Sequence, residues 1–402
     1  MLARHNGQVA LVWGAIPGER VRARIERSGK GVLFAETIEV LESSPDRRPA
    51  PRDWRCGGNV LAHVTYERQL QLKSAIIRDA FARIGRLPLN APPAVAPSPE
   101  QGYRMRARLH ARGTHIGFMR EGSHEICAVG PTGQLLPATV AWIADVEARL
   151  RGDALKGLTS IEIAENIAAT ERACHLELEP GTEAQPFAAL ATEAVTGLSV
   201  QVLDHREVVT LAGRPSISDS IGPLVLERDV RAFFQGNRFL LEPLVQHVTT
   251  LVPDGPVVDL YAGVGLFGLS LAAAGRGNVT LVEGDPISGR DLEENARPYA
   301  ACARVKRFSV EEFLTDVTRE AAATFIVDPP RTGMSRDAID RVLDAQPARL
   351  IYVSCDVATL ARDVRAFVDD GYTLEQISAF DLFPNTAHVE SVCLLRREGA
   401  GL

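Results

Sequence analysis

The chain has 402 residues, 46% of them apolar, and a formal net charge of −7. This length allows two or three domains with a sizeable core, and no apolar run approaches the length needed to span a bilayer. The first residues lack the apolar core of a signal peptide, and the six cysteines are scattered without tight pairing. We therefore expect a cytoplasmic protein with no membrane partner and no disulfide framework.

The net charge is distributed unevenly along the chain. Residues 1–130 hold 20 Lys and Arg against 12 Asp and Glu, a net of +8, so the remainder carries −15. A basic front half on an acidic back half is typical of a nucleic-acid-binding module attached to an enzyme. A chance fluctuation on a solvated surface is the alternative interpretation.

The chain before Asp229 is predicted to form three parts. Residues 1–45 alternate apolar and polar side chains in short runs, which favours a small OB-like β-barrel. Residues 46–92 contain a linker and a helix from about Tyr66 to Ile84, and the proline-rich stretch Pro88–Pro99 is interpreted as a second linker. Residues 93–228 mix strands and helices and predict a central α+β domain.

The pattern changes in residues 229–402 to short apolar strands that alternate with helices. This favours an α/β fold with a mostly parallel, doubly wound sheet. Ligands of such sheets bind at the carboxyl ends of the strands. Four polar side chains fall at predicted strand ends: Asp259, Glu283, Asp328 and Cys355.

A glycine-rich turn, Gly263-x-Gly265-x-x-Gly268, follows the first of these strands. Such a turn lets the backbone approach a ligand, and Glu283 is placed to bind ribose hydroxyls. The turn alone fits NAD as well as S-adenosylmethionine. The downstream Asp328-Pro329-Pro330-Arg331 turn and the strand-end Cys355 favour S-adenosylmethionine, because a hydride-transfer enzyme has no use for them. Amine methyltransferases usually carry an aromatic residue where this chain has Arg331.

A lone cysteine at a strand end, with a carboxylate downstream, indicates covalent activation of a ring. Carbon 5 of uracil is a poor nucleophile, but a thiolate that adds to carbon 6 converts it into an enolate. A base must then remove the proton from carbon 5. Cys355 and Glu390 are the candidates for these two roles.

These residues resemble the RNA uracil-5 methyltransferases of tRNA and 23S rRNA, across most of the chain and most densely in its C-terminal part. The matching motifs are Phe234-Gln235-x-Asn237, Asp259-Leu260-Tyr261-x-Gly263-x-Gly265, Asp328-Pro329-Pro330-Arg331-x-Gly333, Tyr352-Val353-Ser354-Cys355 and Asp381-Leu382-Phe383-Pro384-x-Thr386-x-His388-x-Glu390.

The resemblance implies a Rossmann-like class I methyltransferase domain in residues 229–402, a central domain that binds RNA, and a role for each matched residue. Cys355 would be the nucleophile and Glu390 the base. The S-adenosylmethionine contacts would be Gln235, Tyr261, Gly263, Gly265, Glu283, Ser309 and Asp328. The substrate contacts would be Phe234, Pro329 and Arg331.

The front half departs from the family pattern. Many members hold a [4Fe–4S] cluster with four cysteines, three of them shortly before a Tyr-x-x-Gln-Leu helix. Here the helix motif is present, but Ala50 and Asn59 stand where the first and third cysteines belong, and the fourth is replaced near Thr132. Only Cys56 is left, and Cys127 is interpreted as a thiol without a ligand role. We therefore predict no iron–sulfur cluster and no metal site.

The N-terminal barrel resembles the small RNA-binding domain of the family, with its first strand expected to be missing. Arg20, Arg22, Arg24 and Arg27 are candidates for phosphate contacts, and a solvated basic strand is the alternative. The sequence predicts a monomeric enzyme that methylates carbon 5 of a uridine in structured RNA through a covalent cysteine adduct. A cytosine-5 methyltransferase and an inactive RNA-binding relative remain open as alternatives.

Overall fold

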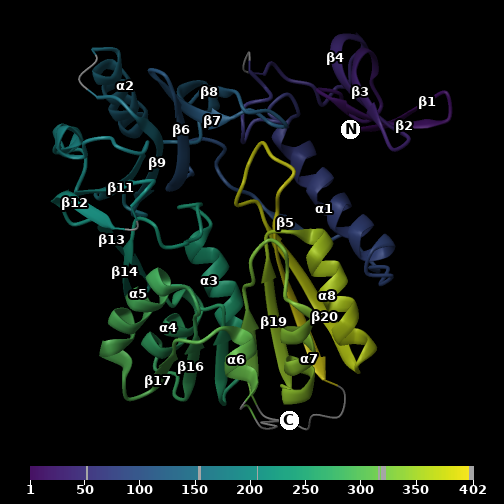
Figure 1. Ribbon diagram of the computed structural model, residues 1–402. Coiled ribbons are helices and arrows are strands. Elements are labelled where there is room, and N and C mark those ends of the chain that lie inside the picture. Colours follow the sequence, from purple (N-terminus) through teal and green to yellow (C-terminus); the bar gives the residue numbers. More distant parts are fainter. Residues whose placement is uncertain (51–52, 153–154, 206, 316, 318–322, 398–402) are drawn as a thin grey trace.

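The computed structural model describes residues 1–50, 53–152, 155–205, 207–315, 317 and 323–397. Figure 1 shows a small N-terminal sheet, a central sheet beside it, and a large sheet flanked by helices that forms the C-terminal part of the molecule. In the described residues, no helix combines the length and the hydropathy needed to cross a membrane.

The N-terminal sheet has four strands in the order β1-β2-β4-β3. They are β1 (Leu2–His5), β2 (Gln8–Trp13), β3 (Arg20–Gly29) and β4 (Val32–Glu42). Strand β1 lies outside the runs that the sequence pattern singled out. Three of the four candidate phosphate-binding arginines on β3 instead face glutamates: Arg20 pairs with Glu42, Arg22 with Glu39 and Arg24 with Glu36. Arg27 lies over the ring of Phe34. These carboxylates offset the positive charge that the sequence assigned to this strand.

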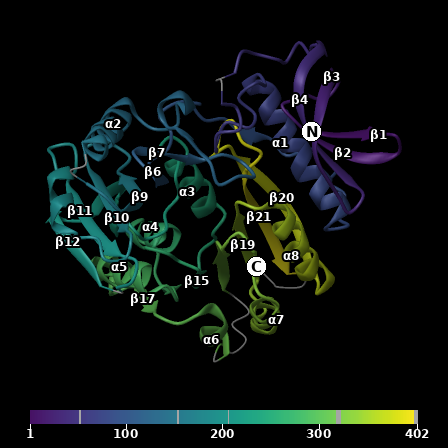
Figure 2. The same cartoon turned by 45° about the horizontal axis from the view of Figure 1, so that its top comes forward.

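Helix α1 (Tyr66–Arg83) follows the N-terminal sheet and lies along the outside of the large sheet, next to α8 (Val357–Asp369), as Figures 1 and 2 both show. Its buried face carries Ile77 and Phe81. The proline-rich stretch after it is not only a linker, because β5 (Val95–Ala96) pairs with the edge of the large sheet. The sequence analysis missed this strand because two residues between prolines are too few to show an alternation of apolar and polar side chains.

The central sheet has seven strands in the order β12-β11-β10-β9-β6-β7-β8, all antiparallel except for the β10–β11 pair. The helices α2 (Pro137–Arg151), η1 (Gly130–Thr132) and η2 (Gln185–Leu190) accompany it. The strands are β6 (Arg106–Arg112), β7 (His115–Met119), β8 (Ile126–Ala128), β9 (Leu158–Glu165), β10 (Arg172–Leu178), β11 (Gly197–Val202) and β12 (Val208–Gly213).

Cys56 and Cys127 form a disulfide across 71 residues of sequence, with their Cα atoms 5.6 Å apart. This corrects the expectations that the cysteines are unpaired and that Cys56 stands alone. The backbone around Cys56 pairs with the end of β7, where the Gly57 amide donates to the Met119 carbonyl over 2.9 Å. Strand β8, which carries Cys127, is the next strand along. The pairing depends on this register, which sequence spacing does not reveal.

The hairpin of β13 (Ser216–Ile221) and β14 (Leu224–Asp229) leads into the large sheet, whose order is β17-β16-β15-β18-β19-β21-β20-β5. Only β21 runs antiparallel to its neighbours. Besides β5, the strands of the large sheet are β15 (Val257–Leu260), β16 (Val279–Val282), β17 (Ala303–Lys306), β18 (Thr324–Val327), β19 (Arg349–Ser354), β20 (Tyr372–Phe380) and β21 (Glu390–Arg397). The mostly parallel, doubly wound sheet predicted from sequence is confirmed.

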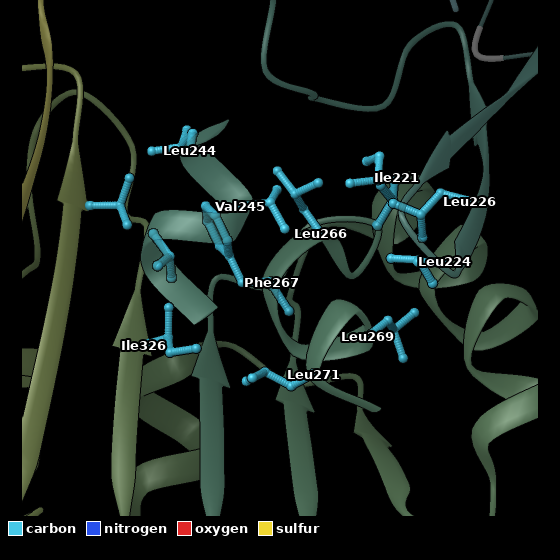
Figure 3. Close-up of a cluster of buried hydrophobic side chains, with 14 of the residues drawn as sticks. Ile221, Leu224, Leu226, Leu244, Val245, Leu266, Phe267, Leu269, Leu271 and Ile326 are labelled. Atoms are coloured by element: carbon cyan, nitrogen blue, oxygen red, sulfur yellow. The ribbon is translucent and has the colours of Figure 1, made fainter. Parts of the chain in front are cut away.

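Helices cover both faces of the large sheet and bury two apolar clusters. The first cluster joins α3, α4 and α5 to one face, and Figure 3 shows its centre around Leu244, Phe267 and Ile326. The second joins α1, α6, α7 and α8 to the other face. The helices are α3 (Leu241–Thr250), α4 (Leu266–Ala273), α5 (Pro286–Ala296), η3 (Arg297–Tyr299), α6 (Val310–Thr315) and α7 (Arg336–Ala345). With both faces covered, the carboxyl ends of the parallel strands are the exposed edge at which a ligand can bind.

Candidate active site

A cavity of about 590 Å³ opens at the carboxyl ends of β15, β16, β18 and β19. Its volume is in the range usual for small-molecule sites. Nine residues singled out from sequence line it: Gln235, Tyr261, Gly263, Glu283, Asp328, Pro329, Arg331, Cys355 and Glu390. They come from segments that lie far apart in the sequence, and the parallel sheet brings them together.

Sheet register places Cys355 beside Glu390. In the antiparallel ladder of β19 and β21, Ser354 pairs with Ser391. Cys355 follows the first of these residues and Glu390 precedes the second, so the two lie next to each other where the ladder ends. Antiparallel neighbours at such positions are close enough for their side chains to interact. The candidate nucleophile and the candidate base therefore share one wall of the cavity.

The surroundings of the Cys355 thiol favour its protonated form. Burial, followed by the nearby carboxyl groups of Glu390 and Asp328, raises its pKa to about 12, while the Arg331 guanidinium acts in the opposite direction. The N-terminus of α8 begins directly after it, with Asp356 accepting a 2.9 Å hydrogen bond from the Thr359 amide. The two carboxyl groups that disfavour the thiolate come from Asp328 at the end of β18 and Glu390 at the start of β21.

The carboxyl groups of the cavity also favour their protonated forms. Burial raises the pKa of Glu390 well above its ordinary value, and the neighbouring Asp328 adds to this effect. Burial likewise raises the pKa of Asp328 to about 7, while a 3.2 Å hydrogen bond from the Gln235 amide opposes the shift. One Glu390 oxygen is buried with no hydrogen-bond partner in the described part of the chain. A buried carboxylate with a free lone pair is a strong proton acceptor.

The opposite end of the cavity suits a nucleoside. Glu283 follows β16, and its side chain accepts hydrogen bonds from the Gly263 amide (2.7 Å) and the Asp285 amide (2.6 Å), which fix the carboxylate at the cavity wall. A Cβ added at Gly263 would meet open space, so the glycine leaves room for a ligand against the backbone. Tyr261 adopts a positive φ of 60°, the kind of strained backbone found where a turn must present a ligand site.

Asp259 stabilises this turn. Its side chain is fully buried, and one oxygen accepts a 2.7 Å hydrogen bond from the Gly268 amide while the other has no partner among the described residues. Burial raises its pKa to about 8. Gly265 begins α4 with a φ of +104°, and a Cβ there would lie 2.4 Å from Leu269. Both residues shape the turn, and neither lines the cavity.

Two further sequence-predicted contacts lie outside the cavity wall. Ser309 is exposed, and its hydroxyl accepts a 3.1 Å hydrogen bond from the Glu312 amide at the start of α6. Phe234 is only 4% exposed and packs under the Arg228 guanidinium. Its neighbour Phe233 is 60% exposed and lines the cavity instead.

Of this Phe-Phe pair, the structure therefore places Phe233 at the cavity and Phe234, the predicted substrate contact, outside it. Successive side chains of an extended backbone point to opposite sides. Gln235 faces the cavity, so the residue two positions before it shares that side, and this alternation was a usable signal. Phe383 is a second cavity residue that the sequence placed in a motif without assigning it a role.

The front half does not present the donors of an iron–sulfur cluster. Such a cluster needs four thiolates, whereas Cys56 is bonded to Cys127. In the ranges that the structure describes, no group of three or more His, Cys, Asp or Glu side chains is placed to hold a metal ion. The residues present therefore do not fit the cluster.

Comparisons with known proteins identify the family of this chain. A family model described as tRNA (Uracil-5-)-methyltransferase matches residues 290–398. The 23S rRNA (uracil(1939)-C(5))-methyltransferase RlmD of Chromohalobacter salexigens is 34% identical, over 98% of this chain and 86% of the relative. RlmD of Pseudomonas putida is 30% identical over 97% of this chain and 89% of the relative. The chain belongs to the RNA uracil-5 methyltransferase family.

A solved structure supports the same assignment for the whole fold. The Pyrococcus abyssi tRNA (uracil-54, C5)-methyltransferase, determined in complex with S-adenosyl-L-homocysteine, is 26% identical. It matches with a TM-score of 0.77 over 96% of this chain and 94% of its own. As a member of this family, the protein is an S-adenosylmethionine-dependent methyltransferase of uracil carbon 5 in RNA, which confirms the activity and the cofactor expected from sequence.

Proposed function

We propose that this enzyme methylates a uridine of structured RNA through a covalent adduct between Cys355 and carbon 6 of the base. The observation that carries this proposal is the β19–β21 register, which sets Cys355 beside Glu390 at the cavity wall. S-adenosylmethionine supplies an electrophilic methyl group when it is bound. The chain's own residues must activate the ring before that transfer and release it afterwards.

The chemistry assigns one step to each residue. The Cys355 thiol gives up its proton to solvent, and the resulting thiolate forms a bond to carbon 6. The electron pair of the carbon 5–carbon 6 double bond moves into an enolate, which makes carbon 5 nucleophilic. After carbon 5 has gained the methyl group, Glu390 accepts the remaining carbon 5 proton. The electrons of that C–H bond re-form the double bond, and the Cys355 sulfur leaves carbon 6.

The raised pKa of Glu390 fits its role as the base, whereas the raised pKa of Cys355 requires a group that stabilises the thiolate. A Glu390 carboxylate in a buried position binds a proton more strongly than one in water, which suits a base that acts on carbon. The Arg331 guanidinium favours the Cys355 thiolate, as does a backbone hydrogen bond at Cys355 itself. We assign Arg331 the role of stabilising that thiolate when the base enters.

The uridine must leave its stack to reach the cavity, since thiolate and methyl group approach opposite faces of the ring. We propose that Phe233, Pro329 and Phe383 contact the extruded base from the cavity wall. An exposed aromatic ring beside a catalytic pocket is a stacking platform for a nucleotide. The Arg106 guanidinium lies 5.9 Å from the centre of the Phe233 ring and extends this surface onto the central sheet.

We propose ribosomal RNA of the large subunit as the first RNA to test. The supporting comparison is the 30–34% identity to two RlmD proteins over nearly the whole chain, against 26% to the tRNA enzyme of known structure. We further propose that the protein works as a monomer in the cytoplasm. Mapping of 5-methyluridine in rRNA and tRNA from a deletion strain distinguishes the two RNA classes.

The decisive experiment traps the adduct. RNA that contains 5-fluorouridine has no carbon 5 proton to lose, so the wild-type enzyme should remain covalently attached in a denaturing gel. Cys355→Ala should form no adduct and no product, whereas Cys302→Ala, which alters another partly exposed thiol, should behave as wild type.

Glu390→Gln separates the two chemical steps. It should methylate once and then accumulate an adduct with ordinary uridine RNA, while Glu375→Gln on the neighbouring strand should turn over normally. Steady turnover by Glu390→Gln without an adduct would show that another group takes the proton. A product of 5-methylcytidine would favour a cytosine-5 enzyme, and RNA binding without any product would indicate an inactive relative.

A further inference from the structure

The loop between β20 and β21 forms part of the active-site wall. It begins at Asp381, carries Phe383 into the cavity and ends where Glu390 opens β21. In Figure 1 it is the yellow loop that rises from the carboxyl end of the sheet towards the start of α1. Arg48, Leu61, Ala96 and Asn237 each make one hydrogen bond to this loop, and a further group of contacts comes from α1, which belongs to the front part of the chain.

Lys73 of α1 makes the central contact. Its ammonium group forms an ion pair with Asp381, and the side chains of both residues are fully buried. The same ammonium donates a 2.9 Å hydrogen bond to the backbone carbonyl of Phe383. The Tyr66 hydroxyl donates to the second Asp381 oxygen over 3.0 Å. Two charges buried at this depth persist only when their geometry is well satisfied.

Gln69, one turn earlier on α1, makes a reciprocal pair of hydrogen bonds with Asn385. Its amide nitrogen donates to the Asn385 side-chain oxygen over 2.9 Å, and its oxygen accepts from the Asn385 backbone amide, also over 2.9 Å. Asn385 has a positive φ of 65°, so the loop turns sharply at this point. Helix α1 therefore holds the loop on both sides of Phe383.

We propose that Lys73 and Gln69 are positioning residues of the methyltransferase, which set the uridine-side wall of the cavity by fixing the backbone on both sides of Phe383. This inference rests on the proposed function of the cavity. The cofactor-side residues Tyr261, Gly263 and Glu283 follow β15 and β16, whereas both hydrogen-bond acceptors of Lys73 belong to the loop.

A replaceable structural contact is the competing interpretation, and burial energetics help to distinguish the two. A buried ion pair adds little stability over an apolar pair of the same shape. Stability alone therefore gives no reason to place an ammonium group under the Phe383 carbonyl. The need to fix the position of the loop does give such a reason, because small misplacements of groups around a reacting base cost about 10²-fold in rate.

The test compares Lys73→Met with Ile77→Ala, a buried apolar truncation one turn further along α1. The readouts are the rate of adduct formation with 5-fluorouridine RNA, the dissociation constant for S-adenosylhomocysteine and the thermal midpoint. Lys73→Met should slow adduct formation about 10- to 100-fold and leave S-adenosylhomocysteine binding unchanged. Ile77→Ala should lower the thermal midpoint and leave both of the other quantities unchanged.

A double variant distinguishes loss of loop positioning from a folding defect. Lys73→Met combined with Asp381→Asn removes both charges and keeps an acceptor for Tyr66, but it does not restore the bond to Phe383. It should recover the thermal midpoint and still form the adduct slowly. Wild-type adduct rates in either Lys73 variant would overturn the positioning role. Failure of the wild-type enzyme itself to form an adduct would overturn the proposed covalent route instead.

Discussion

The protonation state of Cys355 gives the prediction whose size follows most directly from the structure. Burial and two carboxyl groups raise its pKa from 9.0 to about 12. At pH 7 roughly one molecule in 10⁵ then carries the thiolate, about 10³-fold fewer than for a thiol of ordinary pKa. Higher basicity makes each thiolate about 20- to 30-fold more nucleophilic. Exchange with a small disulfide reagent should therefore be about 30- to 60-fold slower at Cys355 than at an ordinary thiol.

The assay follows modification of the Cys355 peptide by mass spectrometry as a function of pH. The rate should rise about tenfold for each pH unit from about 7 to 9, because the thiolate fraction does so well below the pKa. Glu390→Gln removes one of the groups that disfavour the thiolate, so it should raise the rate, whereas Glu375→Gln should not. A rate that reaches a plateau below pH 9 would show that the thiolate is already formed and would refute the assigned electrostatics.

Three further predictions test other features of the structure. Phe233→Ala should weaken RNA binding by about 1–3 kcal/mol in a fluorescence anisotropy titration without changing the thermal midpoint. Phe234→Ala, by contrast, should mainly destabilise the fold. An RNA affinity of Phe233→Ala equal to that of the wild type would contradict the stacking role. The protonated form of Asp259 is favoured in the fold, because its pKa is raised from 3.8 to about 8. Stability should therefore be lost as pH rises from about 4 to about 8, and Asp259→Asn should lessen the fall of the thermal midpoint over that interval. Parallel pH curves for the two proteins would contradict this. Cys56→Ser should lower the unfolding free energy, measured by denaturant titration without reductant, by about 4 kcal/mol, as expected for a loop of 71 residues. A denaturation midpoint equal to that of the wild type would argue against a stabilising disulfide.

The sequence determined the fold class and most of the catalytic wall. Short apolar strands that alternate with helices specify a parallel sheet, and such a sheet places polar residues at strand ends along one edge. Glu283, Asp328 and Cys355 reach the cavity for that reason. Their position follows from the local sequence pattern and from the right-handed crossover that connects parallel strands in nearly all such sheets.

Only the tertiary structure decided the contacts that join distant segments. The Cys56–Cys127 bond spans 71 residues, and the Lys73–Asp381 pair spans 308. Neither has a local period or spacing that a single sequence displays. The pKa of Cys355 belongs to the same class, because desolvation and the charges of Glu390 and Asp328 act through space. Local pattern therefore fixes where a side chain leaves its strand, and the packing of remote elements around it fixes its charge and its partners.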